Sequence, residues 1–479
     1  MSQPVEYLHE NPPGQSDARR IFEKQRAACR ANPYPDYATR VENLKKLEHI
    51  LVEHQDAIAE AISLDFGNRA CQESKLVDVF LPLDSLRYCR KNLRRWMKPQ
   101  RRKVSVWFKP ARNTVLPQPK GVVGVIAPWN YPLFLVVSPL ASALAAGNRC
   151  MVKMASNSQN LCRLFADLVA REFDEDTLAV LPGVRASEFT PLPWDHLVFT
   201  GSPESGKTVM KTAADNLTPV TLELGGKSPT VVCDDFDLEA AAARIVFGKF
   251  VNAGQTCVGP DYLFLPEGKV AEFAGHCRDI MAKRYSGLDD PAYTSIADEK
   301  SFRRLLEWLE DAREKGASVS KLLAGPDHEA AHRKIAPMLV TGVNEEMVLM
   351  QEEIFGPFLP VMTYRSIDEV LDYINERERP LALYLFTRDK ALQDRVIKNT
   401  LSGGVCLNDC VLHAAQHDMP FGGIGNSGMG QYHGPEGFNE LSKLRPVFRQ
   451  ALHPATALLH PPYGKVWNFV YRLMMRFDI

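Results

Sequence analysis

The segment FVNAGQTCVGP holds a cysteine in a setting that suits a reactive thiol. Cys257 follows a predicted helix across Gly254 and precedes Gly259 and Pro260. Glycines in such a loop let the backbone approach a ligand closely, and a thiolate there is a candidate nucleophile for covalent catalysis. Taken alone, a loop cysteine is as well explained as an inert buried thiol, so other residues must decide between the two interpretations.

A carboxylate that could act with this thiol lies 34 positions earlier, in VTLELGGKSP. Glu223 ends a predicted strand immediately before a glycine pair. A carboxylate held there over a cavity can act as a general base toward a thiol or a hydrolytic water. The alternative is a salt-bridged glutamate at the surface.

The segment GVIAPWNYP predicts a strand that ends at Pro128, after which Trp129, Asn130 and Tyr131 emerge at its carboxyl end. This is the usual ligand side of a parallel sheet. A buried Asn130 amide there can donate a hydrogen bond to an oxyanion. Taken alone, Asn130 is better explained as a turn residue.

Two further segments suit a nucleotide cofactor. In FTGSPESGK, Ser202 and Pro203 suit the N-cap and first position of a helix, and a helix N-terminus attracts a pyrophosphate. Gly201 and Gly206 are five positions apart, so this is not a GxGxxG fingerprint, and a turn without a ligand fits the same letters. Lys153 ends another predicted strand, where its cation could meet a ribose hydroxyl or a 2′-phosphate; a solvated lysine is the alternative.

Alternating strand and helix patterns must position these residues. GVVGVIAP, RCMVKM and HLVFTG predict strands, and SPLASALAAGN and QNLCRLFADLVAREF predict the helices between them, which indicates a parallel Rossmann-like sheet. Ser138 and Pro139 suit the N-cap and first position of the first helix, and Gly147 suits its end. A second α/β block begins at VTLEL, includes a helix at 237–251 and continues to about residue 412.

The flanking segments differ in character. Residues 18–64 have the apolar spacing of helices, and the helical pattern resumes from Leu76. Residues 94–103 are basic and lead into a proline-broken strand pattern, which a solvated or subunit-bridging ribbon explains better than a nucleic-acid patch. Near the C-terminus, KVWNFVYRLMMRF is apolar and basic, as an amphipathic helix would be. The apolar run at 132–146 is shorter than the ~20 residues that span a bilayer, so we expect it in the core.

Composition limits the classes of function. The 57 Lys and Arg nearly balance the 58 Asp and Glu, so no global field selects nucleic acid, an anionic membrane or a strongly charged substrate, although local patches can still matter. The ten cysteines include no CxxC pair and no metal-like spacing with histidine, which predicts a reducing cytoplasm and no metal site. The polar N-terminal segment lacks the apolar run of a signal peptide.

With these segments in hand, the chain resembles the aldehyde dehydrogenase superfamily, and most closely its class 3 branch, which includes the bacterial coniferyl aldehyde dehydrogenases. The resemblance covers residues from about 18 to 444. It depends on six motifs in the family's order and approximate spacing: PWNYP, VFTGSPESGK, VTLELGGKSP, FVNAGQTCVGPDY, EEIFGP and PFGGIGNSGMGQYHG.

The resemblance implies a role for each candidate residue in turn. Cys257 would be the nucleophile and Glu223 the general base, and the Asn130 side chain with the Cys257 backbone amide would form the oxyanion hole. Among the cofactor contacts, Trp129 and Ser202 would meet the pyrophosphate.

The same resemblance places three more residues on the cofactor. Lys153 would meet the adenosine ribose, and Glu353 and Phe355 of EEIFGP the nicotinamide ribose and ring. One position departs from the family pattern, because Ser156 stands where many members carry a glutamate that favours NAD. Loss of that carboxylate should relax discrimination against NADP, so we expect use of NAD or NADP.

The expected fold is the α/β aldehyde dehydrogenase fold with three parts. Residues 1–97 and 119–226 would form a Rossmann-like NAD(P)-binding domain and residues 227–419 an α/β catalytic domain. Residues 98–118 and 420–479 would form a small β bridging region, which suggests a homodimer. The C-terminal extension could cap the substrate mouth, pack on a partner subunit or touch a membrane surface, and we rank packing above membrane contact.

The expected activity is oxidation of an aldehyde to its acid through a thioester on Cys257. Coniferyl aldehyde or another aromatic aldehyde, or a medium- to long-chain aliphatic one, is the suggested substrate. The main rival is a coenzyme A-acylating aldehyde dehydrogenase, against which Glu223 argues because hydrolysis needs a base there. A non-catalytic structural protein with the same fold is disfavoured by the intact set of Cys257, Glu223 and Asn130.

Overall fold

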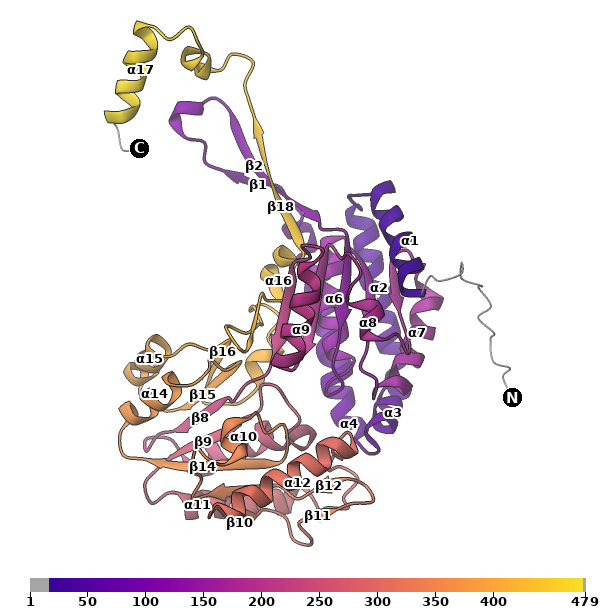
Figure 1. Cartoon of the computed structure of the whole chain (residues 1–479), viewed down its shortest axis with the longest axis vertical. Helices are drawn as coiled ribbons and strands as arrows, with labels where there is room; N and C mark the ends of the chain where they lie inside the picture. The colour runs from indigo at the N-terminus through magenta and orange to yellow at the C-terminus, as the bar shows by residue number, and fades with distance from the viewer. Residues whose placement is uncertain (1–16, 477–479) are drawn as a thin grey trace, which may run out of the picture.

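The computed structural model describes residues 17–476 and consists of two α/β lobes with a projecting arm (Figure 1). The first lobe contains a six-stranded sheet, the second a seven-stranded sheet, and the arm a three-stranded sheet. This arrangement confirms the predicted α/β class. We predict no signal peptide in the N-terminal segment. Most of that segment lies outside the described residues.

Helices make up the start of the described chain, as the periodicity predicts. They are α1 (Asp17–Ala31), α2 (Tyr37–Glu53), α3 (Gln55–Phe66), α4 (Cys71–Ser74), the π-helical turn η1 (Lys75–Phe80) and α5 (Leu81–Trp96). Asp36 caps α2 by accepting a hydrogen bond from the Thr39 amide at 2.8 Å. Leu44, Leu47 and Leu51, at helical spacing on α2, are buried in the core of the first lobe.

The first sheet carries most of the predicted site residues at or near its strand ends. Its strands are β3 (Val122–Ile126), β4 (Arg149–Lys153), β5 (Leu178–Val180), β6 (His196–Gly201), β7 (Val220–Leu224) and β17 (Gly428–Met429). They lie in the order β17-β7-β6-β3-β4-β5, and all except β17 are parallel. The chain adds β4 and β5 on one side of β3 and then β6 and β7 on the other, so ligands are expected beyond the carboxyl ends of β3 and β6.

Helices α6 (Phe134–Ala146), α7 (Gln159–Glu172), α8 (Ala186–Phe189) and α9 (Pro203–Ala214) connect these strands. The prediction that α6 begins at Ser138 and Pro139 is wrong, because the helix begins at Phe134 and Pro139 lies inside it. The carboxylate of Asp78 on η1 accepts hydrogen bonds from the amides of Leu133 and Phe134 at 3.1 and 3.2 Å. The cap therefore comes from a segment 55 residues away rather than from the local sequence.

Other predicted helix ends are confirmed. Gly147 ends α6 in the left-handed conformation, with φ of 90°. Ser202 caps α9 by accepting a hydrogen bond from the Ser205 amide at 3.3 Å, and Pro203 is the first residue of that helix. All residues of α6 are buried, so the apolar run belongs to the core as expected, and within residues 17–476 no helix is long and apolar enough to cross a bilayer.

The second lobe has a sheet in the order β10-β13-β14-β9-β8-β15-β16, parallel except for β10. These strands are β8 (Pro229–Val232), β9 (Tyr262–Pro266), β10 (Ser318–Lys321), β13 (Met338–Thr341), β14 (Phe358–Tyr364), β15 (Ala382–Phe386) and β16 (Gly404–Leu407). The helices are α10 (Leu238–Phe250), α11 (Val270–Arg284), α12 (Glu299–Glu314), α13 (Val348–Gln351), α14 (Ile367–Asn375) and α15 (Lys390–Asn399). Short elements join them: β11 (His328–Glu329), β12 (Lys334–Ile335), and the 3-10 turns η3 (Val251–Gly254) and η4 (Leu412–Ala415).

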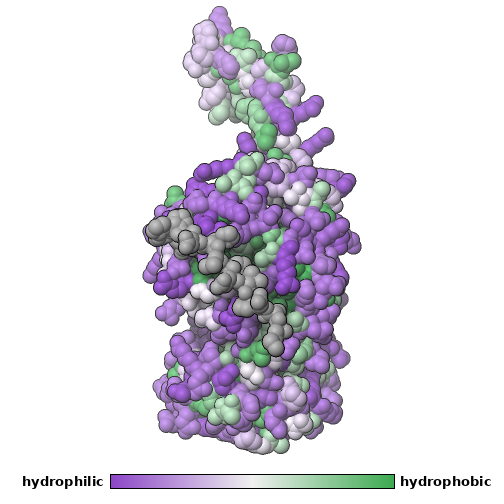
Figure 2. Space-filling view, turned by 90° about the vertical axis from the view of Figure 1, so that its right-hand side faces the viewer, coloured by the Kyte–Doolittle hydropathy of each residue, from purple (hydrophilic) through white to green (hydrophobic). Residues whose placement is uncertain are grey.

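The arm is an antiparallel sheet of β1 (Gln100–Arg102), β2 (Arg112–Pro119) and β18 (Ser442–Arg449), in that order. The turn η2 (Val106–Phe108) lies between β1 and β2, and η5 (Ala455–Leu459) and helix α17 (Lys465–Arg476) follow β18. Figures 1 and 2 show that this arm stands away from the two lobes. The exposed strand pattern and the C-terminal amphipathic helix are both confirmed.

The start of the arm differs from the division predicted from the sequence, which assigned residues 420–479 to the bridging region. β17 pairs with β7 of the first sheet, and α16 (Gly434–Glu440) packs on α5 and α6. The chain therefore returns to the first lobe after residue 420 and enters the arm only with β18.

Candidate active site

The loop that carries Cys257 has an unusual backbone. Asn252, Ala253 and Gly254 follow α10 in succession with φ of 54°, 52° and 78°, all in the left-handed region. Two non-glycine residues in that region cost conformational energy that the surrounding packing must offset. A side chain at Gly254 would place its Cβ 2.2 Å from the carbonyl oxygen of Gly356, so glycine is required there. This turn directs the following residues toward the first lobe.

Hydrogen bonds of the Gln255 side chain hold the part of the loop that follows this turn. Its side-chain amide donates to the carbonyls of Asn252 and Ser295 at 2.9 and 3.1 Å, and its side-chain oxygen accepts from the Ala297 amide at 2.9 Å. The Gln255 carbonyl in turn accepts from the Asn130 side-chain nitrogen at 3.2 Å. The cysteine loop of the second lobe is thus bonded to the loop after β3 of the first lobe.

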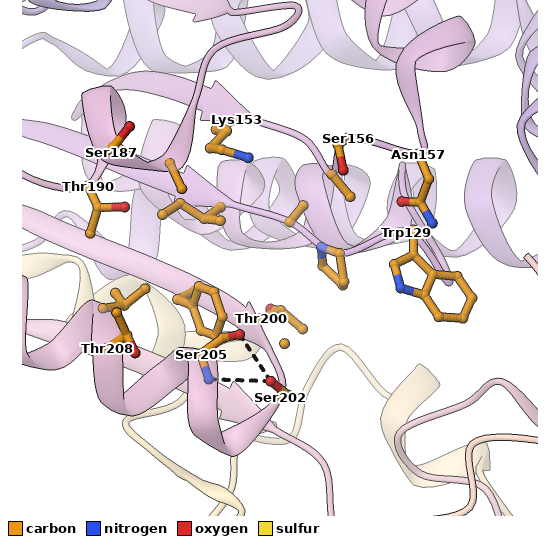
Figure 3. Close-up of a pocket in the computed structure, with 18 of the residues that line it drawn as sticks. Trp129, Lys153, Ser156, Asn157, Ser187, Thr190, Thr200, Ser202, Ser205 and Thr208 are labelled. Carbon is orange, nitrogen blue, oxygen red and sulfur yellow. Dashed lines mark hydrogen bonds between the residues drawn. The ribbon is translucent and has the colours of Figure 1, made fainter. Parts of the chain in front are cut away.

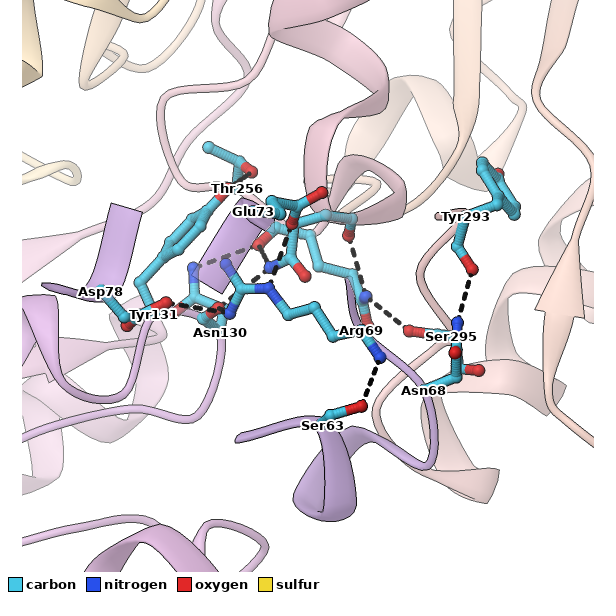
Figure 4. Close-up of polar contacts among 12 residues, drawn as sticks. Ser63, Asn68, Arg69, Glu73, Asp78, Asn130, Tyr131, Thr256, Tyr293 and Ser295 are labelled. Carbon is cyan, nitrogen blue, oxygen red and sulfur yellow. Dashed lines mark hydrogen bonds and ion pairs between the residues drawn. The ribbon is translucent and has the colours of Figure 1, made fainter. Parts of the chain in front are cut away.

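Asn130 is held in place from both sides, as Figure 4 shows. Its carbonyl accepts hydrogen bonds from Arg69 at 3.2 Å and from the Asn252 side chain at 2.9 Å. The side chain is buried, and its amide nitrogen carries two hydrogens, of which one is used by Gln255. The second hydrogen remains to donate to a bound oxygen atom.

Arg69 supports this arrangement and was not anticipated from the sequence. It is buried between Glu73 at 3.0 Å and Asp78 at 3.1 Å, and its guanidinium lies over the Tyr131 ring at 4.9 Å (Figure 4). Burial lowers the pKa of Arg69 and the two carboxylates raise it more, so the guanidinium stays charged. A lone arginine between two helices carries no sequence signal of this role.

Glu223 points from β7 into an enclosed site. Its side chain is 1% exposed, and neither carboxylate oxygen has a hydrogen-bond partner among residues 17–476. Burial raises the pKa of Glu223 to about 7, while the neighbouring Cys257 thiol and Thr200 hydroxyl oppose that rise. A carboxyl group that titrates near neutral pH can both take up and release a proton.

The Cys257 thiol must lose its proton before it can act as a nucleophile. Burial, followed by the negative charges of Glu223 and Glu353, raises the pKa of Cys257 well above its ordinary value. The thiol is therefore protonated in the free protein at neutral pH. Formation of a thiolate needs a proton acceptor, and the adjacent Glu223 carboxylate is placed to serve.

A cavity of about 240 Å³ brings the predicted residues together. Its walls include Cys257, Glu223 and Asn130, although these come from two different lobes. Five of the predicted cofactor residues line it as well: Trp129, Gly201, Ser202, Glu353 and Phe355. Arg304 of α12 also lines this cavity and was not anticipated, because no motif surrounds it.

The EEIFGP segment is anchored by the buried Asp261 carboxylate and the half-buried Lys227 amine. Asp261 accepts a hydrogen bond from the Ile354 amide at 2.9 Å, and Lys227 pairs with Asp261 and donates to the Glu352 carbonyl at 2.9 Å. Burial and the charge of Asp261 raise the pKa of Glu353 to about 8. A Cβ on Gly225 would lie 2.0 Å from the Glu353 carboxylate, so the glycine after β7 makes room for it.

A second and larger cleft of about 820 Å³ adjoins the first, sharing Trp129, Gly201 and Ser202 with it. Figure 3 shows Lys153 and Ser156 on one side and the N-terminus of α9 on the other. Lys153 is half-buried, which lowers its pKa, and its amine donates only a 3.3 Å hydrogen bond to the Met154 carbonyl among residues 17–476. This volume lies within the range of about 300–1,000 Å³ typical of small-molecule sites.

The lining of the larger cleft differs from the cofactor residues predicted from the sequence at two positions. Gly206 lines neither cavity; it faces Leu224 of β7, where a Cβ would come within 2.7 Å, so we assign it to close packing of α9 on the sheet. Asp298, at the start of α12, lines the larger cleft and was missed. Its carboxylate already caps α12 through the Ser301 amide at 2.7 Å.

The family model for the aldehyde dehydrogenase family matches residues 11–447, which is most of the chain. The chain belongs to the aldehyde dehydrogenase family. It is therefore an oxidoreductase that acts on aldehydes, and the resemblance inferred from the six motifs is confirmed.

Individual relatives agree with this assignment. A protein of Pseudomonas aeruginosa described as a probable coniferyl aldehyde dehydrogenase is 48% identical over 98% of this chain and 99% of its own length. The solved substrate-bound state of Staphylococcus aureus AldH superposes with a TM-score of 0.90 at 33% identity, covering 96% of this chain and 100% of that one. The NAD+ complex of an aldehyde dehydrogenase from Bacillus cereus has a TM-score of 0.81 at 26% identity, covering 91% and 89%. The predicted aldehyde dehydrogenase fold is thereby confirmed.

Proposed function

We propose that the protein oxidises an aldehyde to its carboxylic acid through a thioester on Cys257, with NAD or NADP as the oxidant. The observation that carries this proposal is the cavity shared by Cys257, Glu223 and Asn130. A nucleophile, a base and an oxyanion donor that meet in one small buried space suit acyl chemistry at a carbonyl carbon.

The residues present fit a dinucleotide. The capped N-terminus of α9 at Ser202 offers free backbone amides to a pyrophosphate, and Trp129 lies at the junction of the two cavities. Lys153 has an amine available for the adenosine ribose. We propose that Glu353 and Phe355 hold the nicotinamide end, since both line the cavity of Cys257. When bound, the cofactor would supply the oxidation by accepting two electrons and a hydrogen from the substrate carbon.

The first steps use the protein's own groups. Glu223 takes the proton from the Cys257 thiol, and the thiolate sulfur then forms a bond to the aldehyde carbon while the carbonyl electron pair moves onto oxygen. The Asn130 side chain and the Cys257 backbone amide donate hydrogen bonds to that oxygen where its negative charge develops. After oxidation the acyl group remains on Cys257 as a thioester.

Hydrolysis returns the protein to its starting form. Glu223 first releases to solvent the proton that it took from Cys257. It then takes a proton from water, and the water oxygen attacks the thioester carbon. The same oxyanion donors stabilise the second tetrahedral state, which collapses with breakage of the carbon–sulfur bond. The carboxylic acid leaves, and the thiolate recovers a proton.

Two rivals differ in what they predict for Glu223 and Cys257. A coenzyme A-acylating enzyme needs no base for water, whereas a buried Glu223 beside the thiol is what hydrolysis requires. A non-catalytic homologue has no need for the costly burial of a carboxyl group without a hydrogen-bond partner. Both observations favour the hydrolytic enzyme.

The substrate and the assembly are further parts of the proposal. We infer coniferyl aldehyde or another aromatic aldehyde, or a medium- to long-chain aliphatic one, and the name of the Pseudomonas aeruginosa relative supports the first. A homodimer through the strands of the bridging region and a location in the cytoplasm, where all ten free cysteines would stay reduced, complete it.

A panel of aldehydes assayed for reduction of NAD and of NADP tests this function. We expect acid to form without added coenzyme A, with an aromatic or long-chain aldehyde preferred, and we expect Cys257→Ala to remove the activity. Cysteine at position 71 is exposed and lines neither cavity, so Cys71→Ala is the matched control and should behave as the parent protein. Dependence on coenzyme A, or activity in Cys257→Ala, would contradict the proposal.

A further inference from the structure

The motif PFGGIGNSGMGQYHG contributes none of the candidate site residues, yet it runs beside one of them. Within it, β17 pairs with β7 so that Gly428 lies opposite Glu223. The Leu224 amide donates to the Ser427 carbonyl at 3.0 Å. A Cβ on Gly428, whose φ is 137°, would lie 2.1 Å from the Leu222 carbonyl oxygen. Only glycine allows so close an approach, which holds the motif against the strand that carries the base.

Tyr432, four residues beyond Gly428, is held firmly in position. Its amide and carbonyl exchange hydrogen bonds of 2.9 and 2.8 Å with Phe421, and its ring packs on Phe421 at 5.6 Å and on His433 at 4.9 Å. The side chain is 2% exposed, and its hydroxyl has no hydrogen-bond partner among residues 17–476. A buried hydroxyl without a partner costs free energy, so its presence at a well-packed position needs an explanation.

The groups near the Tyr432 hydroxyl belong to the reaction centre. Burial raises the pKa of Tyr432 well above its ordinary value, the charges of Glu223 and Cys257 raise it further, and the Thr200 hydroxyl opposes them. The phenol therefore keeps a hydrogen to donate at neutral pH. Thr200 is buried and lies opposite Glu223 in the register of β6 and β7. Because its hydroxyl also opposes the rise in the pKa of Glu223, Thr200 lies beside both groups.

Glu223 lacks the lasting hydrogen-bond donors that an ionised carboxylate needs. Both of its oxygens are without a partner in the described chain, and the titratable groups that interact with it there are Cys257, Glu353 and Tyr432. A negative charge on Glu353 opposes ionisation of Glu223, and Cys257 loses its hydrogen during the reaction. A donor and an acceptor that both lack partners thus flank the Thr200 hydroxyl, which can accept from one and donate to the other.

We propose that Tyr432 is a positioning residue for the general base: its hydroxyl donates to the Thr200 oxygen, and the Thr200 hydroxyl donates to the ionised Glu223 carboxylate. This chain of hydrogen bonds holds the carboxylate in one orientation and favours its ionised form. Tyr432 lines neither cavity, so it acts through Thr200 rather than on the substrate. The inference rests on the proposed function, because it concerns the proton acceptor of that reaction.

Tyr432→Phe removes the hydroxyl and keeps the ring, so it tests the proposal directly. Hydrogen bonding to the ionised form lowers the pKa of a carboxyl group, so its loss should raise the pKa of Glu223 by about one unit. The rise of kcat with pH should shift upward by the same amount, which lowers kcat about tenfold at pH 6 and leaves it within about twofold at pH 9. An unshifted pH profile in Tyr432→Phe, whether or not KM changes, would overturn the proposal.

A titration without turnover separates this inference from the proposed function. The infrared C=O band of protonated Glu223 in the free protein is identified by its absence in Glu223→Gln. Its midpoint should lie near pH 7 in the parent protein and about one unit higher in Tyr432→Phe. A shifted midpoint in a protein that forms no acid from aldehydes would contradict the proposed function and support the chain of hydrogen bonds.

Thr200→Val tests the same chain at its middle. This variant removes the hydroxyl, so it should raise the midpoint of Glu223 as well, and adding Tyr432→Phe to it should raise the midpoint no further. A midpoint equal to that of the parent in either single variant would overturn the proposal.

Tyr364→Phe is the matched control. The Tyr364 hydroxyl donates to the Val232 carbonyl at 2.9 Å, and Tyr364 lines neither cavity. We expect its infrared midpoint and its dependence of kcat on pH to match those of the parent protein. An equal shift in this control would show that the effect is not specific to the Tyr432 hydroxyl and would overturn the proposal.

Discussion

The carboxyl group of Glu223 and the thiol of Cys257 line one cavity, although Glu223 lies on a strand of the first lobe and Cys257 in a loop of the second. The charge of Glu223 helps to raise the pKa of Cys257, and Glu223 itself titrates at about 7. Above a pH of about 7, Glu223 is therefore ionised beside a Cys257 thiol that still holds its proton, so the carboxylate can accept that proton. This relationship makes the reaction depend on the state of a single carboxyl group.

The first prediction concerns pH. Because burial raises the pKa of Glu223 to about 7, the base is protonated below that pH and ionised above it, so kcat should rise with pH through about 7. Glu223→Gln should lower kcat by about 10²- to 10⁴-fold and abolish this rise. Steady-state kinetics from pH 5.5 to 9 measure both. As a control, Glu239→Gln changes an exposed glutamate on α10 and should keep the same dependence of kcat on pH as the parent protein. If kcat of Glu223→Gln still rose through about pH 7, the titrating group would be a residue other than Glu223.

The second prediction concerns the oxyanion. Asn130→Ala removes the free amide hydrogen and should lower kcat by about 10²- to 10³-fold. Alkylation of Cys257 by iodoacetamide forms no oxyanion, so its rate should stay within a few-fold of the parent rate. Loss of both activities together would instead indicate a displaced cysteine loop, since Asn130 also bonds Gln255.

The third prediction concerns cofactor choice. Ser156 lines the larger cleft, and Lys153 and Asp298 are the charged residues that share its wall within the described chain. We expect the parent protein to use both NAD and NADP. Ser156→Glu should lower kcat/KM for NADP by about 10- to 100-fold through repulsion of the 2′-phosphate and change that for NAD little. Ser156→Gln, which adds the bulk without the charge, is the control. A parent kcat/KM for NADP several orders of magnitude below that for NAD would show that Ser156 does not relax the selection.

The fourth prediction concerns the backbone of the cysteine loop. Gly254→Ala forces a side chain into the left-handed region and against the Gly356 carbonyl, so it should destabilise the fold by more than about 1 kcal/mol and lower activity. A Cβ added at Gly275 on α11 would meet no atom within 4 Å, and Gly275→Ala should be neutral or stabilising by up to about 1 kcal/mol. Urea denaturation of the two variants compares them directly. Equal stability of both would show that the loop relaxes without cost.

The helix ends show what local sequence can predict. Ser202 caps α9 as expected by accepting from an amide three residues ahead, and Gly147 ends α6 by its own backbone freedom. Asp237, where a helix was predicted to begin, is the N-cap of α10 in the same way. The start of α6 was mispredicted because its cap, Asp78, is separated from it by 55 residues in sequence. Only the folded chain brings that carboxylate to the helix.

The candidate site likewise contains some residues that local sequence reveals and others that it does not. Cys257, Glu223 and Asn130 sit in short motifs with characteristic neighbours, so they could be proposed from sequence. Arg69 and Gln255 act through contacts with distant backbone carbonyls, which no short motif records. The start of the arm was misplaced for a related reason, since β17 pairs with a strand about 200 residues earlier.

The most direct test of the account is to trap the acyl-enzyme. Glu223→Gln lacks one of the negative charges that raise the pKa of Cys257, so at alkaline pH its thiol can lose a proton without the carboxylate. At that pH the variant is mixed with an aldehyde and NAD, quenched in acid, digested and analysed by mass spectrometry. The peptide containing Cys257 should gain the mass of the acyl group, and the double variant with Cys257→Ala should gain none. An unmodified Cys257 peptide in a variant that still reduces the cofactor, or an acyl group on another residue, would contradict it.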